Sequence, residues 1–231
     1  MLPLLPRPGS LSCHVAKCPP PYLQDAIDQS VFYSGGSRRP GGAAPAPDTT
    51  AAADVAVDME ALLLTLSEVA GAMQYLHTHC ITHRDLKPKN VLLQSSSKDR
   101  RGFSAKVSDF GLSQVQSEGE RTHVSSKYSG TITHMPPELI EEGKVYPQGD
   151  TFAFGIMMWE IYTGASPYSN MTRPQIMVGV VTHNLRPKFP ETCPDWYKQL
   201  AYRCWRKDPK QRPGFGEVVG ELQELLRTCA R

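Results

Sequence analysis

The sequence predicts an α+β fold that is mainly α-helical and contains one short β-hairpin. Apolar residues recur at steps of three and four over residues 58–79, which is typical of an amphipathic helix. Residues 152–162 are apolar nearly all round, which indicates a helix buried at the centre of the domain. Two short apolar runs, residues 91–93 and 105–107, flank a polar segment that suits a hairpin connection.

The N-terminal third of the chain is expected to contain little regular structure. Residues 1–21 are rich in proline and are interpreted as a disordered tail. Residues 22–34 hold a short helical pattern, whereas residues 35–55 consist largely of Gly, Ala, Pro and Thr and read as a flexible insertion. Residues 56–228 form the predicted folded domain.

Helices organise the remainder of that domain. The first, over residues 58–79, turns one apolar face inward, made of Met59, Leu62, Leu63, Leu66, Val69, Met73 and Leu76. Further helical patterns cover residues 173–181, 195–205 and 215–226. Within the hairpin connection, Lys98, Arg100 and Arg101 are expected to be solvated.

Composition excludes several classes of partner and compartment. The 25 Lys and Arg residues against 23 Asp and Glu leave a formal charge of +2, far from the basic excess that nucleic-acid binding favours. The six cysteines lack the paired spacing of zinc sites and are interpreted as reduced. No apolar run reaches membrane-spanning length, so we expect a cytoplasmic protein. The first acidic residue is Asp25, which leaves an organelle transit peptide open.

Two motifs point to chemistry. The run His83-Arg84-Asp85-Leu86-Lys87-Pro88-Lys89-Asn90 resembles the catalytic loop of protein kinases, and Asp109-Phe110-Gly111 resembles their metal-binding triplet. The triplet alone would be read as a turn. The order of loop, strand pair, triplet and Met135-Pro136-Pro137-Glu138 is that of the family, which outweighs that interpretation.

The resemblance implies a role for each polar residue of the loop. A hydroxyl that attacks a phosphoryl group must lose its proton, and Asp85 matches the family's catalytic base. Lys87 matches the catalytic lysine, a flexible point charge that compensates developing negative charge and indicates serine/threonine specificity.

The resemblance also implies that ATP and Mg²⁺ bind at this loop. Mg²⁺ prefers oxygen ligands, and Asn90 and Asp109 match the family's two metal ligands. Residues Lys87, Asn90, Leu92 and Asp109 form the implied ATP site. Leu92 matches the residue beneath the adenine ring, although an ordinary core leucine is equally compatible with its position.

Further residues extend the resemblance to the activation segment and the last helices. Glu138 and Arg212 match a buried ion pair of the family. Asp150 matches the acid that holds the backbone of the catalytic loop, with ordinary helix capping as the alternative. Thr131 matches the threonine whose hydroxyl bridges the catalytic acid and lysine.

Arg84 matches the arginine that receives an activation-segment phosphate, whose charge could order the segment. An upstream kinase is the implied partner for that modification. The candidate acceptors are Thr122, Ser125, Ser126 and Ser129, and for each of them a solvated loop hydroxyl is the favoured alternative.

The resemblance covers the large, C-terminal lobe. Its sequence is most similar to the tyrosine-kinase-like branch of serine/threonine kinases. The smaller lobe of a kinase carries a glycine-rich loop and a strand lysine. Here Gly35-Gly36 and Gly41-Gly42 lack the required spacing, and Lys17 is followed by Cys18-Pro19-Pro20-Pro21. We therefore expect the small lobe to be missing from this sequence and the isolated chain to be weakly active or inactive.

Three functions remain open at this stage. The first is an ATP-dependent protein serine/threonine kinase that acts on protein substrates. The second is a non-catalytic kinase lobe that binds and regulates a partner. The third is a fragment without a role. The four intact polar residues Asp85, Lys87, Asn90 and Asp109 favour the kinase.

Overall fold

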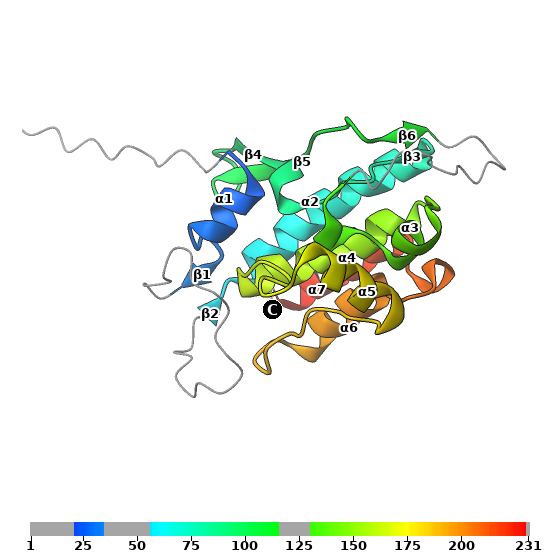
Figure 1. Cartoon of the computed structure of the whole chain (residues 1–231). Helices are drawn as coiled ribbons and strands as arrows, with labels where there is room; N and C mark the ends of the chain where they lie inside the picture. The colour runs from blue at the N-terminus through cyan, green and yellow to red at the C-terminus, as the bar shows by residue number, and fades with distance from the viewer. Residues whose placement is uncertain (1–20, 35–55, 116–129, 230–231) are drawn as a thin grey trace, which may run out of the picture.

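The structure is a computed structural model that describes residues 21–34, 56–115 and 130–229. Its helices are α1 (Leu23–Asp28), α2 (Met59–Thr78), α3 (Pro137–Glu142), α4 (Gln148–Thr163), α5 (Arg173–Thr182), α6 (Asp195–Cys204) and α7 (Phe215–Cys229). Its strands are β1 (Tyr33–Ser34), β2 (Ala56–Val57), β3 (Ile81–Thr82), β4 (Val91–Ser95), β5 (Phe103–Val107) and β6 (Gln114–Val115). The predicted α+β, mainly helical fold is confirmed (Figure 1).

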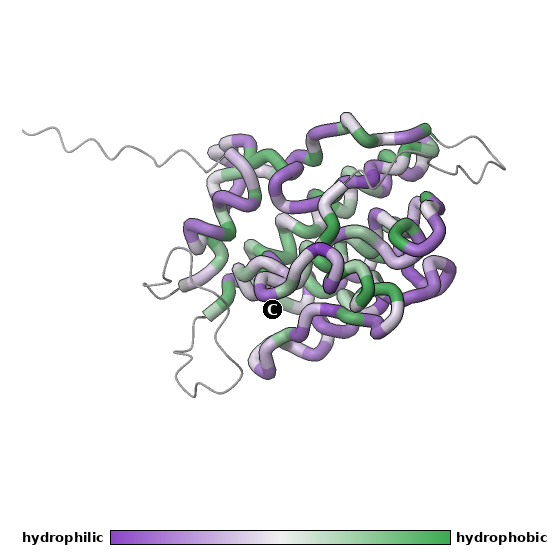
Figure 2. Tube along the Cα trace, viewed as in Figure 1, coloured by the Kyte–Doolittle hydropathy of each residue, from purple (hydrophilic) through white to green (hydrophobic). Residues whose placement is uncertain are grey.

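Helices α2 and α4 form the centre of the molecule. Helix α2 begins where the Asp58 carboxylate accepts a hydrogen bond from the backbone N–H of Ala61 at 2.9 Å. Helix α4 is buried from Asp150 to Tyr162, as the uniformly apolar run predicts. In Figure 2 the hydrophobic colouring follows these inner helices, while hydrophilic stretches lie mainly on the outer helices and loops.

The described residues form three two-stranded antiparallel sheets, and two of these, β3–β6 and β4–β5, flank the catalytic loop. Strands β4 and β5 pair from Val91↔Val107 to Ser95↔Phe103, which is the predicted hairpin. This pairing brings the end of the catalytic loop beside residues 108–109. Strands β3 and β6 pair at Ile81↔Val115 and Thr82↔Gln114, directly before the catalytic loop begins at His83.

The hairpin connection corrects one sequence expectation. The Arg101 side chain is only 2% exposed, because it lies against α2 rather than in solvent. It forms ion pairs with Asp99 at 2.6 Å and Glu68 at 2.9 Å, and donates a hydrogen bond to Thr65 Oγ1 at 2.8 Å. Arg100 is also paired, with Asp58 and Glu60, but it remains about half exposed at 47%. The hairpin is thereby attached to the central helix by charged groups.

Several sequence predictions fall outside the described residues. These are most of the tail over residues 1–21, the insertion over residues 35–55, Lys17, the glycine pairs, and the four candidate phosphate acceptors. Among the described residues, no helix combines the length and apolar character needed to cross a membrane.

Candidate active site

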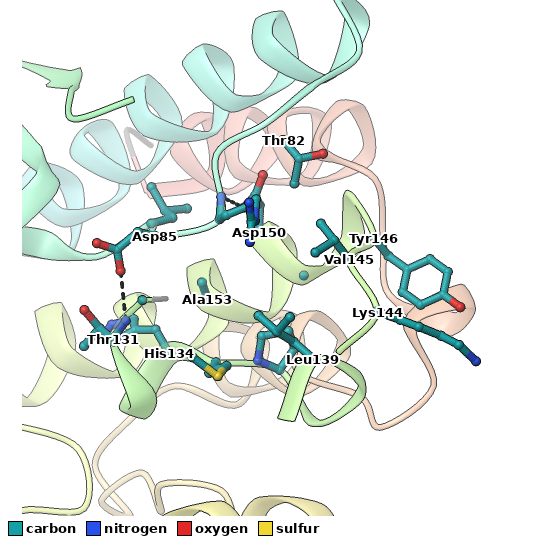
Figure 3. A pocket seen from close by; sticks show the side chains of 16 residues that line it. Thr82, Asp85, Thr131, His134, Leu139, Lys144, Val145, Tyr146, Asp150 and Ala153 are labelled. Atoms are coloured by element: carbon teal, nitrogen blue, oxygen red, sulfur yellow. Dashed lines mark hydrogen bonds between the residues drawn. The ribbon is translucent and has the colours of Figure 1, made fainter. Parts of the chain in front are cut away.

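The structure brings the predicted catalytic acid, lysine and threonine into direct contact. Lys87 Nζ donates to Asp85 Oδ2 at 2.5 Å and to Thr131 Oγ1 at 2.8 Å. The backbone N–H of Thr131 donates to Asp85 Oδ1 at 3.0 Å, the bond drawn as a dashed line in Figure 3. Thr131 comes from a segment 46 residues away from Asp85, so the tertiary fold assembles this group.

The surroundings of Asp85 favour its ionised form. Partial burial acts to raise its pKa, but the hydrogen bond and positive charge of Lys87 and the hydrogen bonds from Thr131 lower it more. The net result is a pKa below the ordinary value of 3.8. Asp85 is therefore a carboxylate at neutral pH, the form that can accept a proton.

Asn90 completes the loop through its side-chain amide. Its Nδ2 donates to the backbone carbonyl of Asp85 at 2.8 Å and to Asp85 Oδ2 at 3.1 Å. With the nitrogen engaged on Asp85, the amide oxygen is the atom left to meet a cation. Asn90 is 5% exposed, so its orientation is fixed by packing as well as by these bonds.

Asp109 lies on the same open cleft as Asn90. A cleft of about 770 Å³ is lined by Tyr22, Gln24, Asp25, Asp28, Lys89, Asn90, Leu92, Ser108 and Asp109. The Asp109 side chain is exposed, and the one hydrogen bond that its Oδ1 accepts from the described residues is a long one of 3.3 Å from Gly111 N–H. One carboxylate and one amide oxygen on a shared, open cleft suit Mg²⁺, which keeps several waters and takes further oxygens from phosphates.

Leu92 is not an ordinary core leucine. Its neighbours along β4, Val91 and Leu93, are buried, whereas Leu92 is 38% exposed and faces the cleft. Tyr22 forms an isolated antiparallel bridge to Leu92, and both residues line the cleft. The exposed leucine offers the flat, apolar contact that a planar base can cover.

Asp150 holds the backbone of the catalytic loop. Its two carboxylate oxygens accept hydrogen bonds of 2.8 Å from the N–H groups of His83 and Arg84, and Oδ2 also lies 2.9 Å from His77 Nε2. Asp150 sits in the first turn of α4 but makes no capping bond to its own helix. The capping alternative is therefore replaced by a contact across 66 residues or more.

Glu138 and Arg212 form a buried ion pair with two parallel bonds. Arg212 NH1 lies 2.7 Å from Glu138 Oε1, and NH2 lies 2.7 Å from Oε2. The two side chains are 8% and 0% exposed. The pair joins α3 to the loop before α7, as the resemblance implied.

Arg84 lies next to the segment that begins at Gly130, and the two line the same cavity. Its backbone has a positive φ of 72°, and its NH1 donates to the carbonyl of Leu112 at 3.3 Å. Its Nε and the hydroxyl of Thr82 are buried without a hydrogen-bond partner among the described residues, and both residues line a cavity of about 20 Å³ (Figure 3). That volume is enough for one water molecule.

Sequence reasoning missed three polar contacts near the site. His83 Nε2 donates to the carbonyl of Ser108 at 3.0 Å, while its Nδ1 accepts from Asp85 N–H at 3.3 Å. His134 Nε2 lies 2.7 Å from Glu160 Oε2, and both residues are 6% exposed. The His83–Ser108 and His134–Glu160 contacts carry no local signal, because each joins segments about 25 residues apart, whereas the His83–Asp85 contact lies within the catalytic loop itself.

The comparisons with known proteins agree with this geometry. The family model described as protein tyrosine and serine/threonine kinase matches residues 17–222. The chain is 38% identical over 169 residues to serine/threonine-protein kinase STY17 of Arabidopsis thaliana, which covers 73% of this chain. It is 37% identical over 154 residues to mitogen-activated protein kinase kinase kinase 12 of Rattus norvegicus, covering 67% of this chain.

The matched region is a small part of those relatives. The aligned residues make up 28% of the Arabidopsis kinase and 16% of the rat kinase. The chain thus spans less than a third of the length of these two relatives.

Proposed function

Because the chain belongs to the protein tyrosine and serine/threonine kinase family, and its relatives are serine/threonine kinases of the tyrosine-kinase-like branch, we propose that it transfers the γ-phosphate of ATP to serine and threonine hydroxyls of proteins. The observation that carries the proposal is the Asp85 carboxylate, ionised and held between Lys87 and Thr131.

Asp85 is the proposed general base. The acceptor hydroxyl donates a hydrogen bond to the carboxylate, and its proton moves there as the new oxygen–phosphorus bond forms and the bond to ADP breaks. Three fixed donors, Lys87 Nζ, Thr131 N–H and Asn90 Nδ2, hold the two carboxylate oxygens. Little reorientation of the base is then needed when an acceptor arrives.

Lys87 is the proposed source of positive charge for the transferring phosphoryl group. Its side chain is 19% exposed, and its ammonium lies beside Asp85, where charge would develop. Asn90 and Asp109 would hold Mg²⁺, which neutralises phosphate charge when bound. The Leu92 side chain would support the adenine from below.

Specificity for serine and threonine is supported by the Lys87–Thr131 contact of 2.8 Å. The hydroxyl of Thr131 and the ammonium of Lys87 lie beside Asp85 and limit the space in front of its carboxylate, the proposed general base. A short aliphatic hydroxyl can reach the carboxylate there, whereas the hydroxyl of tyrosine extends further from its backbone.

Regulation and location complete the proposal. A phosphate placed on the activation segment by an upstream kinase would meet Arg84, whose Nε has no partner among the described groups. The cytoplasm is the proposed compartment, since it supplies ATP and Mg²⁺ and keeps cysteines reduced. The 231-residue sequence has no recognisable glycine-rich loop, so its own affinity for ATP should be weak.

The acceptor class can be tested with peptide mixtures in which the sole hydroxyl residue is serine, threonine or tyrosine. At millimolar Mg·ATP we expect phosphate on the serine and threonine peptides, with none formed when EDTA removes the metal. Transfer confined to tyrosine peptides would contradict the proposal. A cellular effect that survives Asp85→Asn would instead favour the non-catalytic binding module.

A further inference from the structure

Ser108 uses all three of its hydrogen-bonding groups at the junction between the two proposed metal ligands. Its backbone N–H and its hydroxyl both donate to the backbone carbonyl of Asn90, at 2.8 and 3.0 Å. Its own carbonyl accepts from His83 Nε2 at 3.0 Å. The residue immediately after it is Asp109. One serine therefore connects the segments that carry Asn90 and Asp109.

The position of this contact matters because the β4–β5 ladder has already ended. The last paired residues are Val91 and Val107, and both chains leave the sheet there toward the cleft. The two hydrogen bonds from Ser108 to the Asn90 carbonyl link the two segments one residue beyond the last paired residues of the sheet. Only one of the two, the hydroxyl bond, depends on the side chain at position 108.

Asp109 needs such support because its backbone is in the left-handed region, with φ of 61°. A non-glycine residue there carries conformational strain, which relaxes unless neighbouring contacts hold the chain. Within the part of the chain that the structure describes, the Asp109 side chain is exposed and makes a single hydrogen bond, a long one of 3.3 Å to Gly111 N–H. The neighbouring residue Ser108 is held by three hydrogen bonds and can therefore restrain the backbone of Asp109.

We propose that the Ser108 hydroxyl is a positioning group that holds the Asp109 carboxylate opposite the Asn90 amide, and so sets the affinity of the cleft for a divalent metal bound to nucleotide. This inference rests on the metal site of the proposed function. It assigns to Ser108 no contact with metal or substrate. Groups that orient metal ligands change metal affinity without touching the ion.

The test is a titration of the whole chain with Mn²⁺ and the non-hydrolysable ATP analogue AMP-PNP, followed by electron paramagnetic resonance of free Mn²⁺. Ser108→Ala is expected to weaken Mn²⁺ binding about 3- to 10-fold, the loss that one hydrogen bond in such a role produces. Ser108→Thr keeps the hydroxyl and should return the affinity to within about twofold of the unsubstituted chain. Ser104→Ala is the matched control and should change nothing, because Ser104 lies on β5 and its side chain makes no hydrogen bond to the catalytic loop among the described residues.

The inference is overturned if Ser108→Ala binds Mn²⁺ with unchanged affinity, or if its affinity for AMP-PNP without metal falls by the same factor. An unchanged melting temperature for Ser108→Ala separates the positioning role from a general loss of folding. The titration involves no phosphate transfer, so its outcome is independent of catalysis. A chain that shows the Ser108 effect but phosphorylates no peptide would contradict the proposed function alone.

Discussion

At the scale of single residues, the neighbours of Asp85 determine the pH range over which it is ionised. Burial raises its pKa, but Lys87 and Thr131 outweigh that effect, so the pKa lies below 3.8 in the folded chain. A carboxyl with a depressed folded pKa adds stability above its unfolded pKa and loses it as pH falls through the folded value. The contribution is therefore complete at neutral pH.

We predict that the difference in free energy of unfolding between the chain and Asp85→Asn stays constant from about pH 8 to 5, because Asp85 is ionised in both folded and unfolded chains there. The difference should shrink below the ordinary pKa of 3.8, where protonation begins in the unfolded chain. Urea unfolding at several pH values measures it. A difference that changes between pH 6 and 7 would show that the pKa is raised instead.

The hydroxyl of Thr131 provides a second prediction at this scale. Thr131→Val removes the hydroxyl that accepts from Lys87 Nζ, leaves the Lys87–Asp85 contact in place and keeps the side-chain volume. We expect kcat/KM for a serine peptide to fall about tenfold, the cost of one hydrogen bond to a charged group. Thr131→Ser keeps the hydroxyl and is the control. Equal activity of the Val and Ser variants would exclude a role for this bond.

Residues that belong to continuous motifs could be predicted from the sequence, and residues that act through distant partners could not. Asp85, Lys87 and Asn90 occur in one run, and the structure brings them together with Thr131 as the resemblance implied. Ser108 carries no local signal, because its hydroxyl acts on a carbonyl that only the strand pairing brings near.

At the scale of elements, the β4–β5 hairpin shows how tertiary packing overrides local appearance. Lys98, Arg100 and Arg101 occupy the same polar connection, yet Arg101 is 2% exposed and Arg100 is 47% exposed. The difference depends on where α2 passes beneath the hairpin, which residue type and spacing do not encode. The sequence predicted the hairpin itself, because the two apolar runs that form it are continuous.

This contrast predicts unequal effects of two equivalent substitutions. Arg101→Met leaves Asp99 and Glu68 without their shared cation, so we expect the free energy of unfolding to fall by about 2–3 kcal/mol. Arg100→Met removes exposed pairs and should change it by less than about 1 kcal/mol. Urea denaturation followed by circular dichroism compares them. Equal losses would mean that the burial of Arg101 contributes nothing.

At the scale of the whole molecule, the Glu138–Arg212 pair links segments 74 residues apart. Arg212→Met would leave a buried carboxylate without its cation, which typically costs about 3–5 kcal/mol. The double variant Glu138→Met with Arg212→Met removes both charges and should be less destabilised than the single variant. Thermal unfolding measures both proteins. A single variant as stable as the unsubstituted chain would contradict the structural role of the pair.

The overall architecture could be predicted because its signals extend over long segments. The helical periodicity of residues 58–79 and the uniformly apolar run of residues 152–162 correspond to α2 and α4, the two central helices. The exposure of Leu92 at 38% accords with the adenine contact that the resemblance implied, whereas that of Phe110 at 49% could not be predicted, since apolar residues are normally assigned to a core. Both lie in the segments that carry the proposed site, where a ligand or another part of the protein can cover them.

The central claim is that the Asp85 carboxylate carries phosphate transfer, and a single-turnover measurement tests it most directly. The unsubstituted chain and Asp85→Asn are each mixed with Mg²⁺, a serine peptide and radiolabelled ATP, with the protein in excess over the ATP. The affinity of each protein for AMP-PNP is measured in parallel. We predict a transfer rate about 10²- to 10⁴-fold lower for Asp85→Asn, with AMP-PNP affinity within about threefold. No transfer by either protein would favour the non-catalytic binding module, and transfer by Asp85→Asn within tenfold of the unsubstituted chain would contradict the claim.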